Sequence, residues 1–94
     1  MKPLKDEVNK SAIEYIDPNM ILELWDLLYK WAKKYAPMSW VDVKTESHYA
    51  SAMRHLLKWR TWELIDEETK IHHLTAVIAN AMFIMYNEKN KWKI

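Results

Sequence analysis

The chain has 94 residues and contains no glycine. Glycine is the residue that reaches the left-handed backbone region without steric cost, and two-residue β-hairpin turns depend on it. Tight hairpins are therefore disfavoured. The sequence instead favours helices joined by turns that are built from Asn, Asp, Ser or Pro.

Apolar residues recur at steps of three and four residues in long segments, which is typical of amphipathic helices. The first segment follows Asp17, a suitable N-cap, with Pro18 at the first helical position, and it stops before Pro37. Asp66 is a plausible N-cap for the last segment. The pattern predicts helices over about 18–36, 46–62 and 67–88, and a short additional helix over 4–12.

These elements predict an all-α fold, with one domain over residues 1–94 that forms a small bundle of three to four helices. Half of the residues are hydrophobic, including six Trp and five Tyr. A domain of this size buries only about 60% of the surface of its unfolded chain. So many large aromatic residues either fill a dense core or cover a partner subunit. We therefore expect homo-oligomerisation to complete the bundle.

Charge and cysteine content exclude several functional classes. The net charge of +1 does not provide the basic stripe of a general DNA-binding domain. The absence of Cys excludes a disulfide scaffold and thiolate zinc sites. No apolar run approaches 18 residues, and "MKPLKDEVNK" lacks the apolar region of a signal peptide. We therefore expect no membrane contact and a cytoplasmic location.

The segment from residue 54 to residue 83 carries most of the candidate site residues. Arg54 and His55 are adjacent, so on a helix their side chains point about 100° apart. Glu63 and Asp66 are three residues apart, and if a helix continues through them they share a face and can share Mg²⁺ or Mn²⁺. Both pairs also have a structural interpretation: a histidine that is bonded to a carboxylate, and an acidic helix N-terminus.

Two further sets of polar residues lie on expected helices. His73 and Asn80 are two turns apart on one face of the last helix, where polar groups on an apolar face need partners. A hydrogen bond in the core is the alternative to a binding role. Lys33 and Lys34 stand in the last turn of the first helix and can meet phosphates, although such lysines are usually solvated.

Taken in order, these residues resemble one known family. The segments that carry the resemblance are "AKKY" (32–35), Trp40, "RHL" (54–56), Trp59 or Trp62, Glu63 with Asp66, Glu68, "HL" (73–74) and Asn80. Over residues 12–86 the chain is similar to the small phage-associated family named for dATP/dGTP diphosphohydrolase, N-terminal type, which is related to the all-α MazG-like nucleotide pyrophosphohydrolases. The family usually has Gly where this chain has Trp62 and Lys70, and commonly a second His where this chain has Ala76. The EExxE helix of MazG-like enzymes is absent.

The resemblance implies metal-dependent cleavage of a purine deoxynucleoside triphosphate (dNTP) to the monophosphate and pyrophosphate, in the cytoplasm of a phage-infected host. It implies Mg²⁺ or Mn²⁺ as the cofactor. The residues that would act are Glu63, His55 and His73 in catalysis, Glu63, Asp66 and Glu68 as metal ligands, and Arg54, Lys33, Lys34, Trp40 and Asn80 in substrate binding. These roles require the helices over 46–62 and 67–88 to pack antiparallel.

Two other functions remain open at this point. The chain can be a non-catalytic module that binds or sequesters a nucleotide, in phage anti-defence or in regulation. It can also be an interaction protein whose Trp-rich surface docks on another chain.

Overall fold

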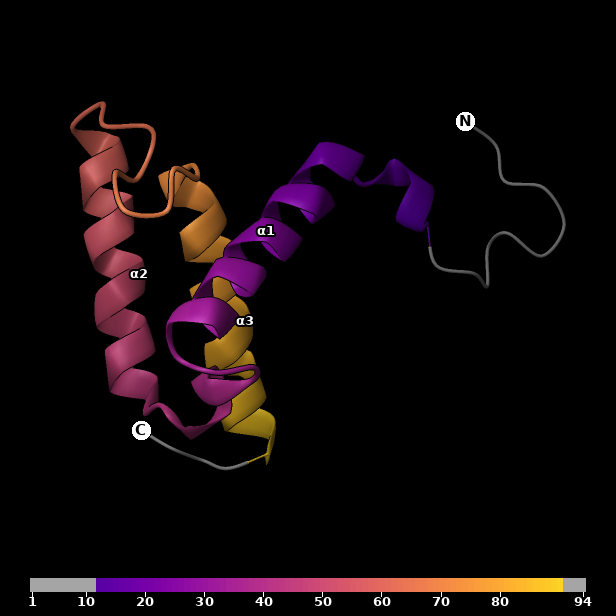
Figure 1. The fold of residues 1–94 in the computed structure, drawn as a ribbon, viewed down its shortest axis with the longest axis vertical. Helices are drawn as coiled ribbons and strands as arrows, with labels where there is room; N and C mark the ends of the chain where they lie inside the picture. Colours follow the sequence, from indigo (N-terminus) through magenta and orange to yellow (C-terminus); the bar gives the residue numbers. More distant parts are fainter. Residues whose placement is uncertain (1–11, 91–94) are drawn as a thin grey trace, which may run out of the picture.

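A computed structural model describes residues 12–90, and these residues form a fold built from helices (Figure 1). The elements are η2 (Ile13–Tyr15), α1 (Pro18–Lys34), η3 (Ser39–Asp42), α2 (Thr45–Arg60) and α3 (His73–Asn90). Within the described range, β-type pairing is limited to one isolated antiparallel bridge between Ile65 and His72. The all-α prediction is therefore confirmed. The short helix expected over 4–12 lies outside the described residues except for Ala12, which is not helical.

Helix α1 begins as predicted but ends two residues earlier. The Asp17 side chain accepts a hydrogen bond from the backbone N–H of Asn19 at 3.0 Å, and Pro18 occupies the first turn. The helix was expected to reach residue 36 but ends at Lys34. A residue before proline is pushed out of the helical region, and Ala36 has an extended φ of 158°. Pro37 therefore restricts the backbone of the residue before it, and the helix ends earlier than the proline itself.

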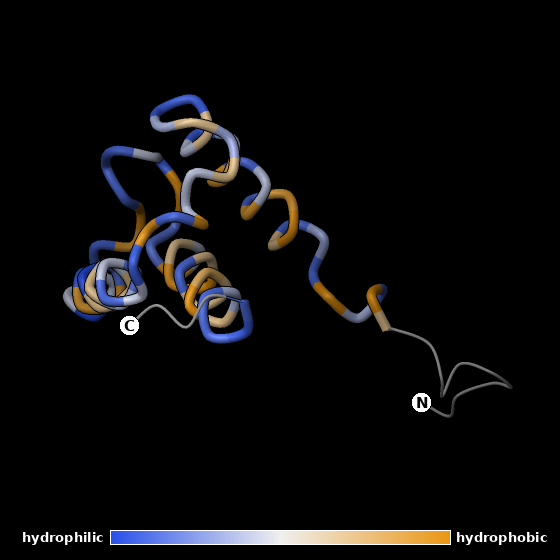
Figure 2. The backbone as a smooth tube through the Cα atoms, turned by 90° about the horizontal axis from the view of Figure 1, so that it is seen from below, coloured by the Kyte–Doolittle hydropathy of each residue, from blue (hydrophilic) through white to orange (hydrophobic). Residues whose placement is uncertain are grey.

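Helices α2 and α3 lie side by side and antiparallel, as the predicted site requires (Figure 1). Helix α1 crosses α3 obliquely, and its N-terminal half projects beyond the α2–α3 pair in both views (Figures 1 and 2). This arrangement leaves large apolar side chains exposed on every helix, among them Trp25, Tyr49, Leu57 and Met85. Completion of the bundle by a second copy stays a prediction. No helix in the described part of the chain combines the length and the apolar character needed to cross a lipid bilayer.

The predicted start of the third helix at residue 67 is wrong, because α3 begins at His73. Asp66 does accept capping hydrogen bonds, but they come from the N–H and hydroxyl of Thr69 and close a turn. The N-cap of α3 is His72, whose Nδ1 accepts from the N–H of Leu74 at 3.0 Å. The carboxylate of Glu23 in α1 accepts from the N–H of His72, and so stabilises the same helix end.

Three residues that carry a Cβ adopt the left-handed backbone conformation: Met38 (φ 62°), Trp62 (φ 72°) and Lys70 (φ 64°). Such a conformation costs about 1–2 kcal/mol for an L-residue. The expectation that turns would use Asn, Asp, Ser or Pro is wrong at these positions. Trp62 and Lys70 stand where the related family usually has glycine, so the chain keeps a glycine-like backbone without glycine. The left-handed Trp62 also explains why α2 ends at Arg60 instead of residue 62.

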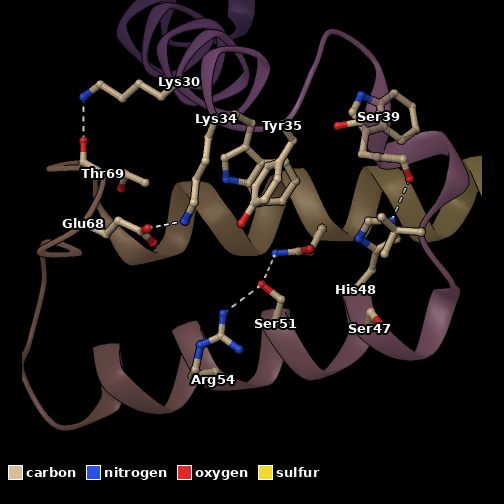
Figure 3. Close-up of a pocket in the computed structure, with 14 residues that line it drawn as sticks. Lys30, Lys34, Tyr35, Ser39, Ser47, His48, Ser51, Arg54, Glu68 and Thr69 are labelled. Carbon is tan, nitrogen blue, oxygen red and sulfur yellow. Dashed lines mark hydrogen bonds and ion pairs between the residues drawn. The ribbon is translucent and has the colours of Figure 1, made fainter.

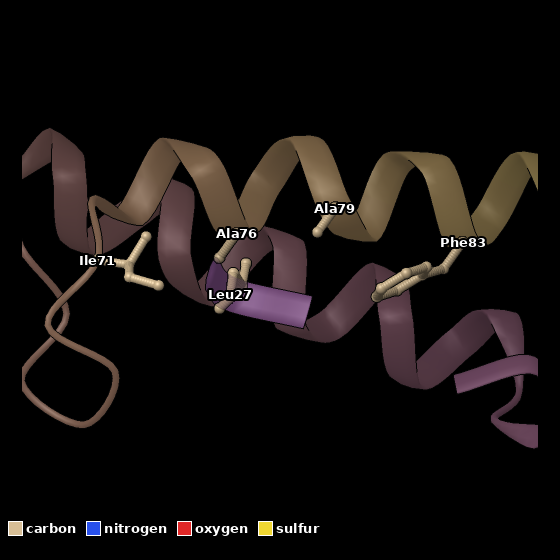
Figure 4. Packing of buried hydrophobic residues seen from close by; sticks show 5 residues of the cluster. All are labelled: Leu27, Ile71, Ala76, Ala79 and Phe83. Atoms are coloured by element: carbon tan, nitrogen blue, oxygen red, sulfur yellow. The ribbon is translucent and has the colours of Figure 1, made fainter. Parts of the chain in front are cut away.

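The apolar core lies between α1 and α3, whereas the α2–α3 interface is polar. The buried apolar side chains are Leu27, Ile71, Ala76, Ala79 and Phe83 (Figure 4). The Phe83 ring stacks on Trp40 at 4.4 Å and tilts against Trp31 at 5.2 Å. The buried polar residues are His48, His73, Thr75, Asn80 and Asn87. His48 lies on α2 and the side chains of His73, Asn80 and Asn87 contact α2, whereas Thr75 bonds Glu23 of α1. Polar burial of this kind destabilises a small domain unless every group is paired. The α2–α3 interface is therefore the first place to look for function.

Candidate functional site

A cavity of about 480 Å³ opens between the end of α1, η3, α2 and α3 (Figure 3). Its size falls in the range of about 300–1,000 Å³ that is typical of small-molecule sites. The lining residues come from the four helices, from the turns beside them and from the loop between α2 and α3 (residues 61–72, the corner loop). They are Lys30, Trp31, Lys34, Tyr35, Ser39, Trp40, Val43, Ser47, His48, Ser51, Arg54, Glu68, Thr69 and Asn80.

Aromatic rings and cations are both prominent in this lining. Among the described lining residues, three are aromatic (Trp31, Tyr35 and Trp40), three are cationic (Lys30, Lys34 and Arg54), and one, Glu68, is acidic. Figure 3 shows Lys30, Lys34 and Arg54 toward one end, with Ser39, Ser47 and His48 toward the other. The excess of positive charge at one end favours an anionic ligand group there, and the rings provide flat surfaces for stacking.

Two lysines of α1 hold the corner loop at the cationic end. The Lys34 ammonium donates to the Glu68 carboxylate, and this hydrogen bond raises the pKa of Lys34. The Lys30 ammonium donates to the backbone carbonyl of Thr69. Across the cavity, Arg54 on α2 makes a single hydrogen bond within residues 12–90, a long one of 3.4 Å to the Ser51 hydroxyl. Its guanidinium therefore keeps most of its donors for a ligand.

Asn80 sits at the polar interface with a fixed orientation and an unpaired oxygen. Its amide nitrogen donates to the Ala76 carbonyl at 2.9 Å and to the Ser51 hydroxyl at 3.1 Å. A carbonyl can only accept, so the bond to Ala76 decides which side-chain atom is nitrogen. Its Oδ1 is fully buried and accepts no hydrogen bond from the described residues. A buried acceptor without a partner is a candidate contact for a donor on a ligand.

Next to the cavity, a second group of side chains joins α2, the corner loop and α3. The Nδ1 atoms of His55 and His73 are 2.8 Å apart, and the Nε2 of His73 is 2.8 Å from an oxygen of Glu63. Asp66 completes the group: one ligand atom each from His55, Asp66 and His73 lie within 4.8 Å of one another. Two imidazoles and a carboxylate at this spacing can hold a divalent metal ion.

The pKa shifts of His55 and Asp66 suit metal ligation. Burial lowers the pKa of His55, helped by the nearby His73 and Arg54 and opposed by Asp66, so the ring is neutral near pH 7. Burial raises the pKa of Asp66, but the two hydrogen bonds from Thr69, together with the nearby His55 and His73, outweigh burial and leave the pKa below its usual value. A neutral imidazole and an ionised carboxylate are the forms that bind metal.

All the predicted site residues except Lys33 lie in the cavity or in the neighbouring cluster. Arg54, Lys34, Trp40 and Asn80 line the cavity, and His55, His73, Glu63 and Asp66 form the neighbouring cluster. Glu68 lines the cavity and pairs with Lys34, so it lies apart from the other two expected metal ligands. Lys33 does not line the cavity and instead lies over the Tyr29 ring.

The sequence reasoning missed several cavity residues, including Lys30, Ser51 and His48. Lys30 is one helical turn before Lys34, and Ser51 is three residues before Arg54, so helical spacing alone could have placed both on the right face. His48 is buried and bonds the Trp40 carbonyl at 3.1 Å, and no local pattern indicates that contact.

The cavity and the cluster are adjacent, although the cluster side chains do not line the cavity. Arg54 and His55 are adjacent on α2; Arg54 lines the cavity and His55 belongs to the cluster. Thr69 lines the cavity and also donates two hydrogen bonds to Asp66. A ligand whose anionic end lies between Lys34 and Arg54 would therefore extend toward the cluster.

Comparison with known proteins gives a family and one phage relative. Residues 2–94 match the family model of the dATP/dGTP diphosphohydrolase N-terminal domain. The chain is similar to a protein named dATP/dGTP diphosphohydrolase from Salmonella phage PMBT28, with 28% identity over 91 residues. The match covers 97% of this chain and 31% of the phage protein, so the chain spans about a third of that relative. No solved structure matches the chain. The chain belongs to the dATP/dGTP diphosphohydrolase N-terminal family.

Proposed function

We propose that the chain binds a purine deoxynucleoside triphosphate in the cavity and hydrolyses it to the monophosphate and pyrophosphate with a divalent cation. The observation that carries the proposal is that a cavity with aromatic and cationic walls lies next to a cluster able to hold a metal ion. The name of the phage relative supports the choice of purine substrates.

The cationic end of the cavity suits the phosphate chain. The guanidinium of Arg54 matches two phosphate oxygens with a pair of parallel hydrogen bonds. Lys34 can exchange its bond to Glu68 for a bond to phosphate, since both partners are exposed. Lys30 adds a third cation from the same face of α1. Together they balance most of the charge of a triphosphate.

The aromatic wall suits the base. Trp40 lines the cavity and is held in place by the buried Phe83 ring beneath it, so it offers a fixed surface for stacking. The unpaired Oδ1 of Asn80 accepts a hydrogen bond from an exocyclic amino group, which adenine and guanine both carry and which pyrimidines carry only in cytosine. A purine satisfies both features, as does cytosine, so the preference for purines is supported by the name of the phage relative.

The reaction adds water to the α-phosphorus and breaks the bond between that phosphorus and the α–β bridging oxygen. A divalent cation, when bound, neutralises phosphate charge and lowers the pKa of water. His55, Asp66 and His73 would hold this ion, and Glu63 would keep the His73 ring in position. Arg54 and Lys34 would stabilise the charge on the leaving pyrophosphate.

The test is product analysis for all four dNTPs with Mg²⁺, Mn²⁺ or Co²⁺. We expect pyrophosphate and monophosphate in equal amounts, faster for dATP and dGTP, and a loss of activity in Asp66→Asn. That variant keeps an oxygen acceptor for Thr69, so the turn is preserved. Equal rates for Asp66→Asn and the wild type would refute the proposed catalytic centre.

A second candidate function is nucleotide binding without hydrolysis. It is favoured by Ala76, which stands where the related family commonly has a second histidine and is buried in the apolar core. The methyl side chain of Ala76 can neither transfer a proton nor bind a metal ion, so it cannot take part in catalysis. Calorimetry that shows tight dNTP binding, together with no pyrophosphate after prolonged incubation with any of the three ions, would establish this function in place of the enzyme.

A further inference from the structure

We infer that His55, Asp66 and His73 form a site for a borderline first-row transition-metal ion, of the class of Fe²⁺, Co²⁺ or Zn²⁺, in preference to Mg²⁺. We also infer that Glu63 acts as a positioning residue for this site. The inference rests on the proposed function in placing the ion beside the nucleotide phosphates. Ion binding itself is a property of the protein alone and can be measured without nucleotide.

The donor atoms determine the class of ion. Mg²⁺ prefers octahedral oxygen ligands and gives up its water reluctantly. Imidazole nitrogens suit Zn²⁺, Fe²⁺ and their neighbours, and two histidines with one carboxylate are a recurrent donor set for such ions. The ligand atoms of His55, Asp66 and His73 come from three separate elements and lie within 4.8 Å of one another. Three protein ligands leave coordination positions for water or phosphate.

Two of the three ligands, His73 and Asp66, are already oriented by hydrogen bonds to other side chains. Glu63 accepts from the Nε2–H of His73, so the lone pair of a neutral His73 is on Nδ1, which faces His55. This is the carboxylate–histidine–metal arrangement that orients ligands in known metal sites. Thr69 donates twice to the Oδ2 of Asp66 and fixes the carboxylate plane. His73 is completely buried, which restricts its ring further.

The distance between the two histidines shows what an ion must change. At 2.8 Å the two Nδ1 atoms share one proton, and because His73 has its proton on Nε2, the donor is His55. Two nitrogens that each bind an ion at about 2.0–2.1 Å lie about 3.3 Å apart in a tetrahedral site. The rings therefore separate by a few tenths of an ångström, and the proton of His55 moves from Nδ1 to Nε2. His55 is only half-buried, so its ring has room to move.

The test titrates nucleotide-free protein with Co²⁺ and with Mg²⁺ by calorimetry, while the visible absorption of Co²⁺ and the ¹⁵N shifts of the histidines are recorded. We expect one saturable Co²⁺ site, at least about tenfold tighter than Mg²⁺, and a change of tautomer at His55. His55→Asn and Asp66→Asn should each lose at least about tenfold in Co²⁺ affinity. Glu63→Gln should lose about 10–100-fold and alter the Co²⁺ spectrum.

His72→Asn is the matched control. His72 is adjacent to the cluster but serves as the N-cap of α3, and asparagine is a preferred N-cap residue. Its Co²⁺ affinity should equal that of the wild type. Circular dichroism checks that each variant is folded, and if His55→Asn unfolds, Asp66→Asn decides the outcome because asparagine retains the acceptor for Thr69.

Absence of saturable Co²⁺ binding in the wild type, or equal binding in the folded cluster variants, would overturn the inference. The outcome is separable from that of the proposed function. Co²⁺ binding with no dNTP turnover leaves the metal site standing and removes the enzyme. Turnover of dNTPs by a wild type that shows no saturable Co²⁺ binding removes this metal site and leaves hydrolysis at another centre.

Discussion

Replacing Arg54 by glutamine removes the cation best placed to clamp a phosphate, with little change to the fold. Arg54 is exposed on α2, lines the cavity, and makes one described hydrogen bond, a long one of 3.4 Å to Ser51. Surface substitutions of this kind change the free energy of unfolding by about 0.5 kcal/mol or less. The midpoint of thermal unfolding should therefore shift by no more than about 4 °C.

The effect on nucleotide binding should be much larger. A hydrogen bond to a charged group contributes about 1.5–3 kcal/mol, and each 1.4 kcal/mol is a factor of ten in affinity. The Kd for dATP or dGTP should therefore rise about tenfold to about 150-fold in Arg54→Gln. The change should appear at constant stability, which separates a ligand contact from a structural role.

Isothermal titration with each nucleotide, paired with thermal unfolding, measures both quantities. Arg60→Gln is the matched control, because Arg60 is an exposed arginine on the same helix but does not line the cavity. Its Kd should remain within about twofold of the wild type. If Arg54→Gln and Arg60→Gln bind nucleotide equally well, the phosphates do not lie where we propose.

Three further predictions concern the scaffold of the site. Lys70→Gly should raise the free energy of unfolding by about 0.5–1 kcal/mol, since relief of the left-handed strain exceeds the entropy cost of glycine; denaturant titration that shows a loss would contradict this. Glu23→Ala should cost about 1–2 kcal/mol, because two hydrogen bonds at the start of α3 are lost, whereas Asp26→Ala, which breaks one exposed pair, should cost less than about 0.5 kcal/mol. Phe83→Ala should lower the free energy of unfolding by about 3–5 kcal/mol in the same titration. A loss below about 1 kcal/mol would show that neighbouring side chains fill the space left by the ring.

The helices could be predicted from sequence because their signals are local. The 3.6-residue period and the Asp17–Pro18 start locate α1, and α2 was predicted to within one residue at its start. The start of α3 could not be predicted in this way. The acidic run after Asp66 is the signature of a helix N-terminus and here forms a turn. Besides the local cap of His72, a contact that stabilises the start of α3 comes from Glu23, which is 49 residues before His72.

The candidate site was predicted in its residue types more than in its geometry. Glu63 and Asp66 were paired on the assumption that a helix runs through both, but α2 ends at Arg60. His73 connects the two carboxylates instead: it contacts Glu63 directly, and its ligand atom lies within 4.8 Å of that of Asp66. Such tertiary convergence has no signature in sequence spacing. The left-handed backbone at Trp62 and Lys70 was not predicted either, although the family usually has glycine at both positions.

The most direct test is a crystal structure with a non-hydrolysable dATP or dGTP analogue and Co²⁺, collected at the cobalt absorption edge. We predict an anomalous peak among His55, Asp66 and His73, phosphate density beside Arg54 and Lys34, and the purine against Trp40. A nucleotide bound outside the cavity, or a cobalt peak remote from these three ligands when the nucleotide is present, would contradict the account.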